Sequence, residues 1–107
     1  MRDRQGTQSP TLRREDVLRI LGSHRGELAD RYGVTRLGIF GSVARNAASD
    51  DSDVDVVVET QVPDLLMMVN LKEDLEQLLK RKVDLVRYRV RMNPFLKKRI
   101  DNEARYV

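Results

Sequence analysis

Four valines in the middle of the chain are interleaved with two carboxylates, in the order Ser52-Asp53-Val54-Asp55-Val56-Val57-Val58. Such a β-branched run predicts a buried strand over 54–58. Residues two apart in a strand point to the same side, so we expect Asp53 and Asp55 to share one face. Two carboxylates this close repel each other unless a cation lies between them. Oxygen ligands without His or Cys favour Mg²⁺, so the segment predicts a magnesium site. A solvated acidic turn is the alternative.

Two other binding motifs do not fit this region. A calcium loop starting at Asp51 needs Gly at its sixth position and Glu at its twelfth, where this chain has Val56 and Val62. A P-loop needs Gly-Lys followed by Ser or Thr, and the sequence contains no such triplet. The lack of Cys excludes disulfides and thiolate metal sites, and a single His, His24, excludes a His-rich zinc centre within one chain.

The segment Gly38-Ile39-Phe40-Gly41-Ser42-Val43-Ala44-Arg45 indicates a strand that turns into a short helix. Backbone N–H groups point outward at such a turn, and a small residue lets a phosphate approach closely. Ser42 can add a hydroxyl donor, and Arg45 lies one turn further on. The segment therefore predicts an anion site at Gly41, Ser42 and Arg45, although a Gly-Ser turn on its own also fits a plain connection.

A third acid, Asp84, is flanked by apolar residues on another short predicted strand. An acid partly withdrawn from water costs free energy unless it has a partner. On its own, Asp84 fits an edge-strand residue paired with Lys82 or Arg87. If its strand lies beside the strand of Asp55, however, Asp84 joins Asp53 and Asp55. Three carboxylates can hold two metal ions near an attacking hydroxyl.

Apolar periodicity and turn residues predict four helices that alternate with three strands. We expect helices from about Ser9–Thr11 to Tyr32 (ended by Gly33), over 43–48, from Pro63-Asp64 through Leu79, and from Asn93-Pro94 to about Ala104. We expect strands over 34–40, 54–58 and 83–86. Leu65 and Phe95 are expected on the apolar faces of the last two helices. The order αβαβαβα predicts an α/β (α+β) fold with a single small mixed β-sheet flanked by helices.

Composition narrows the class of protein. A chain of 107 residues suits one domain, expected over 10–107 after a flexible N-terminus over 1–9. Net charge runs +4 over 1–45, −7 over 46–80 and +6 over 81–107. Aromatic residues form only 5% of the chain, so a stacking platform for nucleic acid is not expected. No run is long enough to span a bilayer, and we expect a cytoplasmic protein without membrane contact.

Together, Gly41-Ser42, then Asp53-Val54-Asp55 after ten intervening residues, and the later Asp84 resemble the nucleotidyltransferase superfamily of DNA polymerase β. Within it, Phe40 to Arg45 and Ser52 to Asp55 look like the minimal nucleotidyltransferase (MNT) domains. Members of this family are commonly encoded beside HEPN-domain toxins and act as their antitoxins. Characterised MntA-type members transfer AMP from ATP to a tyrosine of the toxin.

The resemblance implies an active nucleotidyltransferase with a HEPN toxin as its partner. It implies that Gly41 and Ser42 bind the triphosphate of ATP and that Arg45 occupies a motif position. It also implies that Asp53 and Asp55 hold Mg²⁺, expected as two ions. Asp84 would be the third acid, which helps with metal and with activation of the acceptor hydroxyl. One departure is Asn46-Ala47, where family members usually carry Gly-Glu.

Three other functions are open at this point. The chain could neutralise a toxin by binding alone, without catalysis. It could transfer a nucleotide to a small molecule, although few residues remain for a second substrate-binding domain. The basic ends could attract nucleic acid, which would show as a steep salt dependence of binding.

Overall fold

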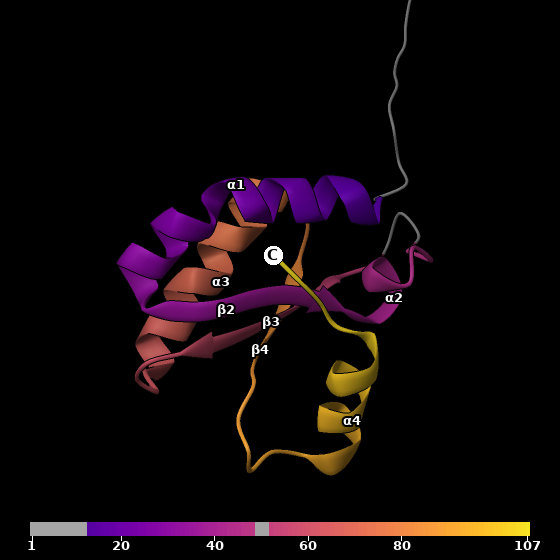
Figure 1. Ribbon diagram of the computed structural model, residues 1–107. Helices are drawn as coiled ribbons and strands as arrows, with labels where there is room; N and C mark the ends of the chain where they lie inside the picture. Colours follow the sequence, from indigo (N-terminus) through magenta and orange to yellow (C-terminus); the bar gives the residue numbers. More distant parts are fainter. Residues whose placement is uncertain (1–12, 49–51) are drawn as a thin grey trace, which may run out of the picture.

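The computed structural model describes residues 13–48 and 52–107. The predicted flexible N-terminus over 1–9 and the acidic Asp50 and Asp51 lie outside these residues. The elements, in chain order, are α1 (Arg14–Tyr32), β2 (Val34–Phe40), α2 (Gly41–Ala44), β3 (Val54–Thr60), α3 (Leu65–Leu79), β4 (Val83–Arg87), α4 (Pro94–Glu103) and β5 (Arg105–Tyr106) (Figure 1). The predicted mixed sheet flanked by helices is confirmed.

The four strands form one sheet in the order β4-β3-β2-β5. β2 pairs antiparallel with β3 and with β5, whereas β3 and β4 run parallel. The short strand β5 is absent from the predicted order, because two residues are too few to show any periodicity. Gly38 makes this pairing possible, since a Cβ there would lie 2.6 Å from the carbonyl oxygen of Arg105.

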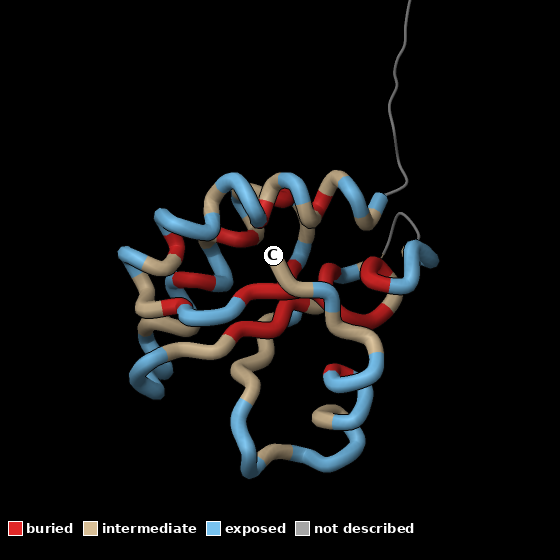
Figure 2. Tube along the Cα trace, viewed as in Figure 1, coloured by how far each residue is buried: buried red, intermediate tan, exposed pale blue. Residues whose placement is uncertain are grey.

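Helices cover the two faces of the sheet unequally. α1 and α3 lie together on one face, and α4 lies on the other (Figure 1). The larger core, under α1 and α3, includes Leu21, Ile39, Val56 and Leu75. Phe40, Val57 and Ile100 form a smaller buried cluster on the α4 side. Buried positions accordingly concentrate on the central strands and the inner sides of α1 and α3, while α4 is largely exposed (Figure 2).

The first helix starts later than the sequence predicts. Arg13 occupies the N-cap position without a side-chain hydrogen bond, and the hydroxyl cap expected near Ser9–Thr11 lies outside the described residues. Instead, the Arg14 N–H donates to Oδ1 of Asn46 at 3.1 Å, and Nη1 of Arg14 donates to the Ala44 carbonyl at 3.1 Å. A residue distant in sequence thus satisfies an N–H that the helix leaves unpaired. At the other end, Gly33 has φ +68° and caps the helix as predicted.

The other helices confirm the expected elements with shifted details. Asp64 caps α3, and Asn93 caps α4 by accepting from two backbone N–H groups. Leu65 is 83% exposed and Phe95 is 82% exposed, although the sequence predicts both on the apolar faces of these helices. Both lie in the first turn of their helices, and apolar spacing along a helix does not by itself ensure that a side chain is buried. The short helix α2 begins at Gly41 and ends at Ala44, rather than spanning 43–48.

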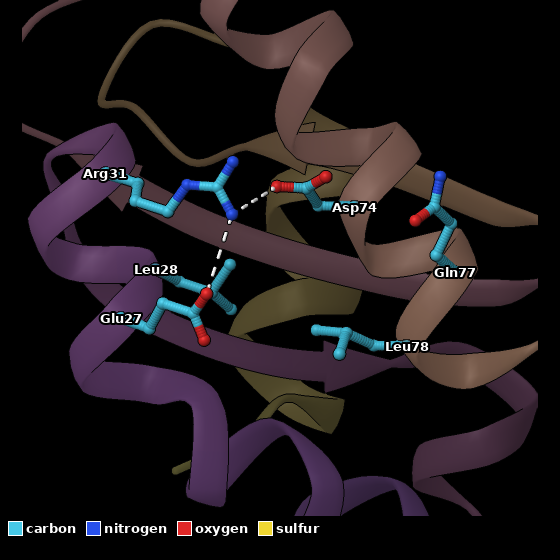
Figure 3. Close-up of a pocket in the computed structure, with 6 residues that line it drawn as sticks. All are labelled: Glu27, Leu28, Arg31, Asp74, Gln77 and Leu78. Carbon is cyan, nitrogen blue, oxygen red and sulfur yellow. Dashed lines mark ion pairs between the residues drawn. The ribbon is translucent and has the colours of Figure 1, made fainter.

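Polar side chains connect α1 to α3 around a cavity of about 150 Å³. Figure 3 shows Arg31 of α1 between Glu27 and Asp74, with N–O distances of 3.5 and 3.2 Å. The hydroxyl of Tyr32 also donates to Asp74. This cavity lies on the α1–α3 side, and none of its lining residues is a predicted site residue. Within 13–48 and 52–107, every helix is too short or too polar to cross a membrane.

Candidate active site

The turn from β2 into α2 places a glycine directly against a carboxylate of β3. Gly41 has φ +73°, a conformation that residues with a side chain rarely adopt. A Cβ at this position would overlap Oδ2 of Asp55 and would lie 3.0 Å from its Cγ. Both the backbone conformation and the available space therefore require glycine. Ser42 follows it and is half-buried.

Asp55 and Asp84 are neighbours on one face of the sheet, because they are in-register partners on the parallel strands β3 and β4. Asp55 is half-buried, whereas Asp84 is exposed. Burial and, next, the charge of Asp84 raise the pKa of Asp55 above its usual value; Arg99 opposes this shift, Asp53 adds to it and Arg45 opposes it. The charges of Asp84 and Asp53 therefore both act on the Asp55 carboxyl.

The donors at this end of the sheet suit a hard divalent cation. Asp53 lies immediately before β3 and is exposed. Among the described residues, no three His, Cys, Asp or Glu side chains lie close enough to hold one ion together. Asp53, Asp55 and Asp84 therefore do not form a closed cage, and their assignment as metal ligands stays a prediction. Mg²⁺, however, is usually held by one or two carboxylates together with substrate phosphates. The oxygen-only donor set fits that arrangement.

A residue that sequence reasoning missed, Glu103, connects α4 to the Gly41 turn. Its Oε1 accepts from the Gly41 N–H at 3.1 Å and from Nη1 of Arg45 at 3.1 Å. A carboxylate thus occupies the same donors that the sequence assigns to an anion. Glu103 lies 62 positions after Gly41, and no local motif marks it. Arg99, whose charge favours the ionised form of Asp55, was missed for the same reason.

The departure from the family pattern after Arg45 has a structural explanation. Asn46 has φ +58°, in the left-handed region that Gly adopts readily and that Asn tolerates better than most residues. Asn46 therefore adopts a backbone conformation that Gly at this position would also adopt readily. Its side chain also caps α1 through Arg14, a contact that Gly could not make.

Sequence comparison gives the same family as the motifs. The polymerase beta nucleotidyltransferase family matches residues 26–107. Protein adenylyltransferase MntA of Thermococcus cleftensis is 47% identical over 73 residues, which cover 67% of this chain and 74% of the relative. MJ0126 of Methanocaldococcus jannaschii, to which protein adenylyltransferase activity is provisionally assigned, is 37% identical over 93 residues and covers 86% of this chain and 95% of the relative.

Solved structures agree on the fold. A structure described as a minimal nucleotidyltransferase superposes with a TM-score of 0.71 at 36% identity, covering 90% of this chain and 97% of that one. A toxin–antitoxin structure with AMP-PNP gives a TM-score of 0.66 at 21% identity, covering 89% and 72%, and therefore shows the fold alone. The predicted nucleotidyltransferase fold and enzyme class are confirmed: the chain belongs to the polymerase beta nucleotidyltransferase family.

Proposed function

We propose that this chain is a Mg²⁺-dependent protein adenylyltransferase. It transfers AMP from ATP to the hydroxyl of a tyrosine on a cognate HEPN toxin. This modification neutralises the toxin, so the chain acts as an antitoxin. One observation carries the proposal: the half-buried Asp55 lies beside Asp84 on one side and against the Gly41 turn on the other. Metal-binding acids and a phosphate-binding turn are the two parts that nucleotidyl transfer needs at one place.

The names of the relatives support the substrate classes. Protein adenylyltransferase MntA covers most of this chain at 47% identity. A structural neighbour at 18% identity is a tri-AMPylated Shewanella oneidensis HEPN toxin in complex with MNT antitoxin. Another contains AMP-PNP, an analogue of ATP. Together they favour ATP as the donor and a HEPN protein as the acceptor, and we expect this reaction in the cytoplasm.

The turn residues bind the donor in this proposal. The N–H groups of Gly41 and Ser42 and the hydroxyl of Ser42 donate hydrogen bonds to the phosphate oxygens, and Arg45 adds positive charge. The Glu103 carboxylate, which shares these donors in the structure, gives way to the triphosphate. Because the Gly41 turn lies directly against Asp55, these donors would lie next to the acids that would hold Mg²⁺.

The acids complete the reaction centre. Asp53 and Asp55 would hold Mg²⁺, which when bound neutralises the triphosphate and the charge that develops on the α-phosphoryl group. Asp84 helps to hold metal and accepts the proton of the acceptor hydroxyl. The acceptor oxygen forms a bond to the α-phosphorus as the bond to pyrophosphate breaks, so AMP is transferred and pyrophosphate leaves.

Transfer of label from [α-³²P]ATP tests the proposal. The wild-type chain, Mg²⁺ and the HEPN protein encoded beside it should yield labelled HEPN protein. Asp55→Asn should abolish labelling, whereas Asp30→Asn, the same chemical change at an exposed position of α1, should not. Unlabelled HEPN protein that nevertheless binds the chain would refute the catalytic proposal. Full protection of cells by an Asp53→Ala/Asp55→Ala variant would show that binding alone neutralises the toxin.

A further inference from the structure

The outer edge of β4 forms the floor of an open groove. β4 is an end strand of the sheet, and a cavity of about 720 Å³ runs along its residues Leu85, Val86 and Arg87. One wall comes from the start of α3, including Leu65 and Met68, and the other from the start of α4, including Leu96. The groove begins next to Asp84 and runs away from it along the strand, so it is separate from the Gly41 turn.

The backbone of this floor is available for pairing. The Lys82 carbonyl accepts from Val54 at 2.9 Å, and the Tyr88 N–H donates to Val58 at 2.8 Å, so even-numbered residues of β4 face β3. Odd-numbered residues therefore face outward. The outward N–H of Val83 is already bonded to Oε2 of Glu76 at 2.9 Å. Among the described residues, no strand pairs with the outer side of β4, which leaves the stretch from Leu85 to Arg87 open.

The walls are apolar and the surroundings are basic. Leu65, Val90 and Phe95 are each more than four-fifths exposed, at 83%, 85% and 82%. Leu65 lines the groove, and Val90 and Phe95 are sequence neighbours of the lining residues Arg89 and Leu96. Exposed apolar side chains beside a groove are typical of an interaction site. Between 85 and 100 the chain has six Arg or Lys residues and no Asp or Glu, and Asp64 is the one acidic residue among those that line the groove. Arg89 and Arg91 are exposed and form no ion pair with any described residue.

We propose that this groove binds an extended segment of the partner protein, which adds to the sheet as a strand beside β4. Main-chain hydrogen bonds to the Leu85–Arg87 edge provide affinity, and alternate apolar side chains enter the two walls. Acidic residues of the segment face Arg87 and Arg89. A second copy of this chain fits less well, because two such basic edges would repel each other. The identity of the partner as the HEPN protein rests on the proposed function.

Hydrogen exchange of the full chain, free and mixed with the HEPN protein, tests the proposal. In the complex, exchange of the Leu85 and Arg87 amides should slow at least about tenfold, as for newly formed strand hydrogen bonds. Arg89→Glu should weaken the complex by about tenfold or more, measured by calorimetry. Arg25→Glu, the matched charge reversal at an exposed position of α1, should leave the affinity unchanged.

Three results would each overturn the groove proposal. The first is a complex in which the Leu85 and Arg87 amides stay unprotected, the second is an Arg89→Glu affinity equal to that of wild type, and the third is that no complex forms. The outcome is independent of catalysis. If the HEPN protein is labelled but the Leu85 and Arg87 amides are not protected, the proposed function stands and the groove proposal is refuted. Protected amides without labelling would do the reverse.

Discussion

Replacing Gly41 by Ala should damage the active site far more than the fold. A residue with a side chain at φ +73° costs about 1–2 kcal/mol. The added methyl also overlaps Oδ2 of Asp55, so the carboxylate must move by about 1 Å. A displacement of that size among reacting groups lowers a rate by about 100-fold. We therefore expect the initial rate of AMP transfer to fall at least about 100-fold, while the free energy of unfolding falls by only about 1–2 kcal/mol.

Initial rates with [α-³²P]ATP and urea unfolding followed by circular dichroism measure the two effects separately. Gly26→Ala is the matched control, because a Cβ at that exposed position of α1 meets nothing within 4 Å. This control should keep full activity and gain about 0.5–1 kcal/mol of stability. Transfer by Gly41→Ala within about threefold of wild type would refute the argument, because the overlap with Asp55 would then be harmless.

Three further changes have distinct expected outcomes. Because burial and then Asp84 raise the pKa of Asp55, the native state binds this proton more tightly than the unfolded chain; stability therefore falls as the pH rises from the unfolded pKa of about 3.9 through the raised native pKa. Asp55→Asn should remove that slope in urea unfolding and be more stable than wild type at pH 7, although inactive; a less stable variant would contradict this. Glu103→Gln should lower the Kd for Mg²⁺-ATP by roughly two- to fivefold in calorimetry, because a charge that competes for Gly41 is lost; weaker binding would show that Glu103 orders the site instead. Tyr32→Phe removes a hydrogen bond to the Asp74 carboxylate and should cost about 1–2 kcal/mol of stability without changing AMP transfer. A slower reaction would show that this contact between α1 and α3 affects the active site.

Local patterns were sufficient for most of the fold. The valine run predicted β3, and Gly33, Asp64 and Asn93 marked helix ends that the structure confirms. These features depend on neighbours in sequence, so the sequence shows them directly. The two-residue strand β5 left no such pattern, because its pairing with β2 depends on the space that Gly38 leaves.

The candidate site likewise has residues that the sequence predicts and residues that it does not. Asp55 and Gly41 were predicted from their own segments, and the condition on Asp84, that its strand lie beside that of Asp55, is met. Glu103 and Arg99 were not predicted, because α4 reaches the site only after the chain has crossed the sheet. Contacts between distant segments set these positions, and one sequence carries no local sign of them.

The most direct test of the central claim, that Asp55 and Asp84 act at one metal–nucleotide site, is a double-mutant cycle on the affinity for Mg²⁺-bound AMP-PNP. Calorimetry would give the Kd for wild type, Asp55→Asn, Asp84→Asn and the double variant. In-register neighbours that share an ion should show a coupling of at least about 1 kcal/mol, so the double variant binds little worse than the weaker single variant. Losses that simply add, or single variants that bind like wild type, would contradict the account.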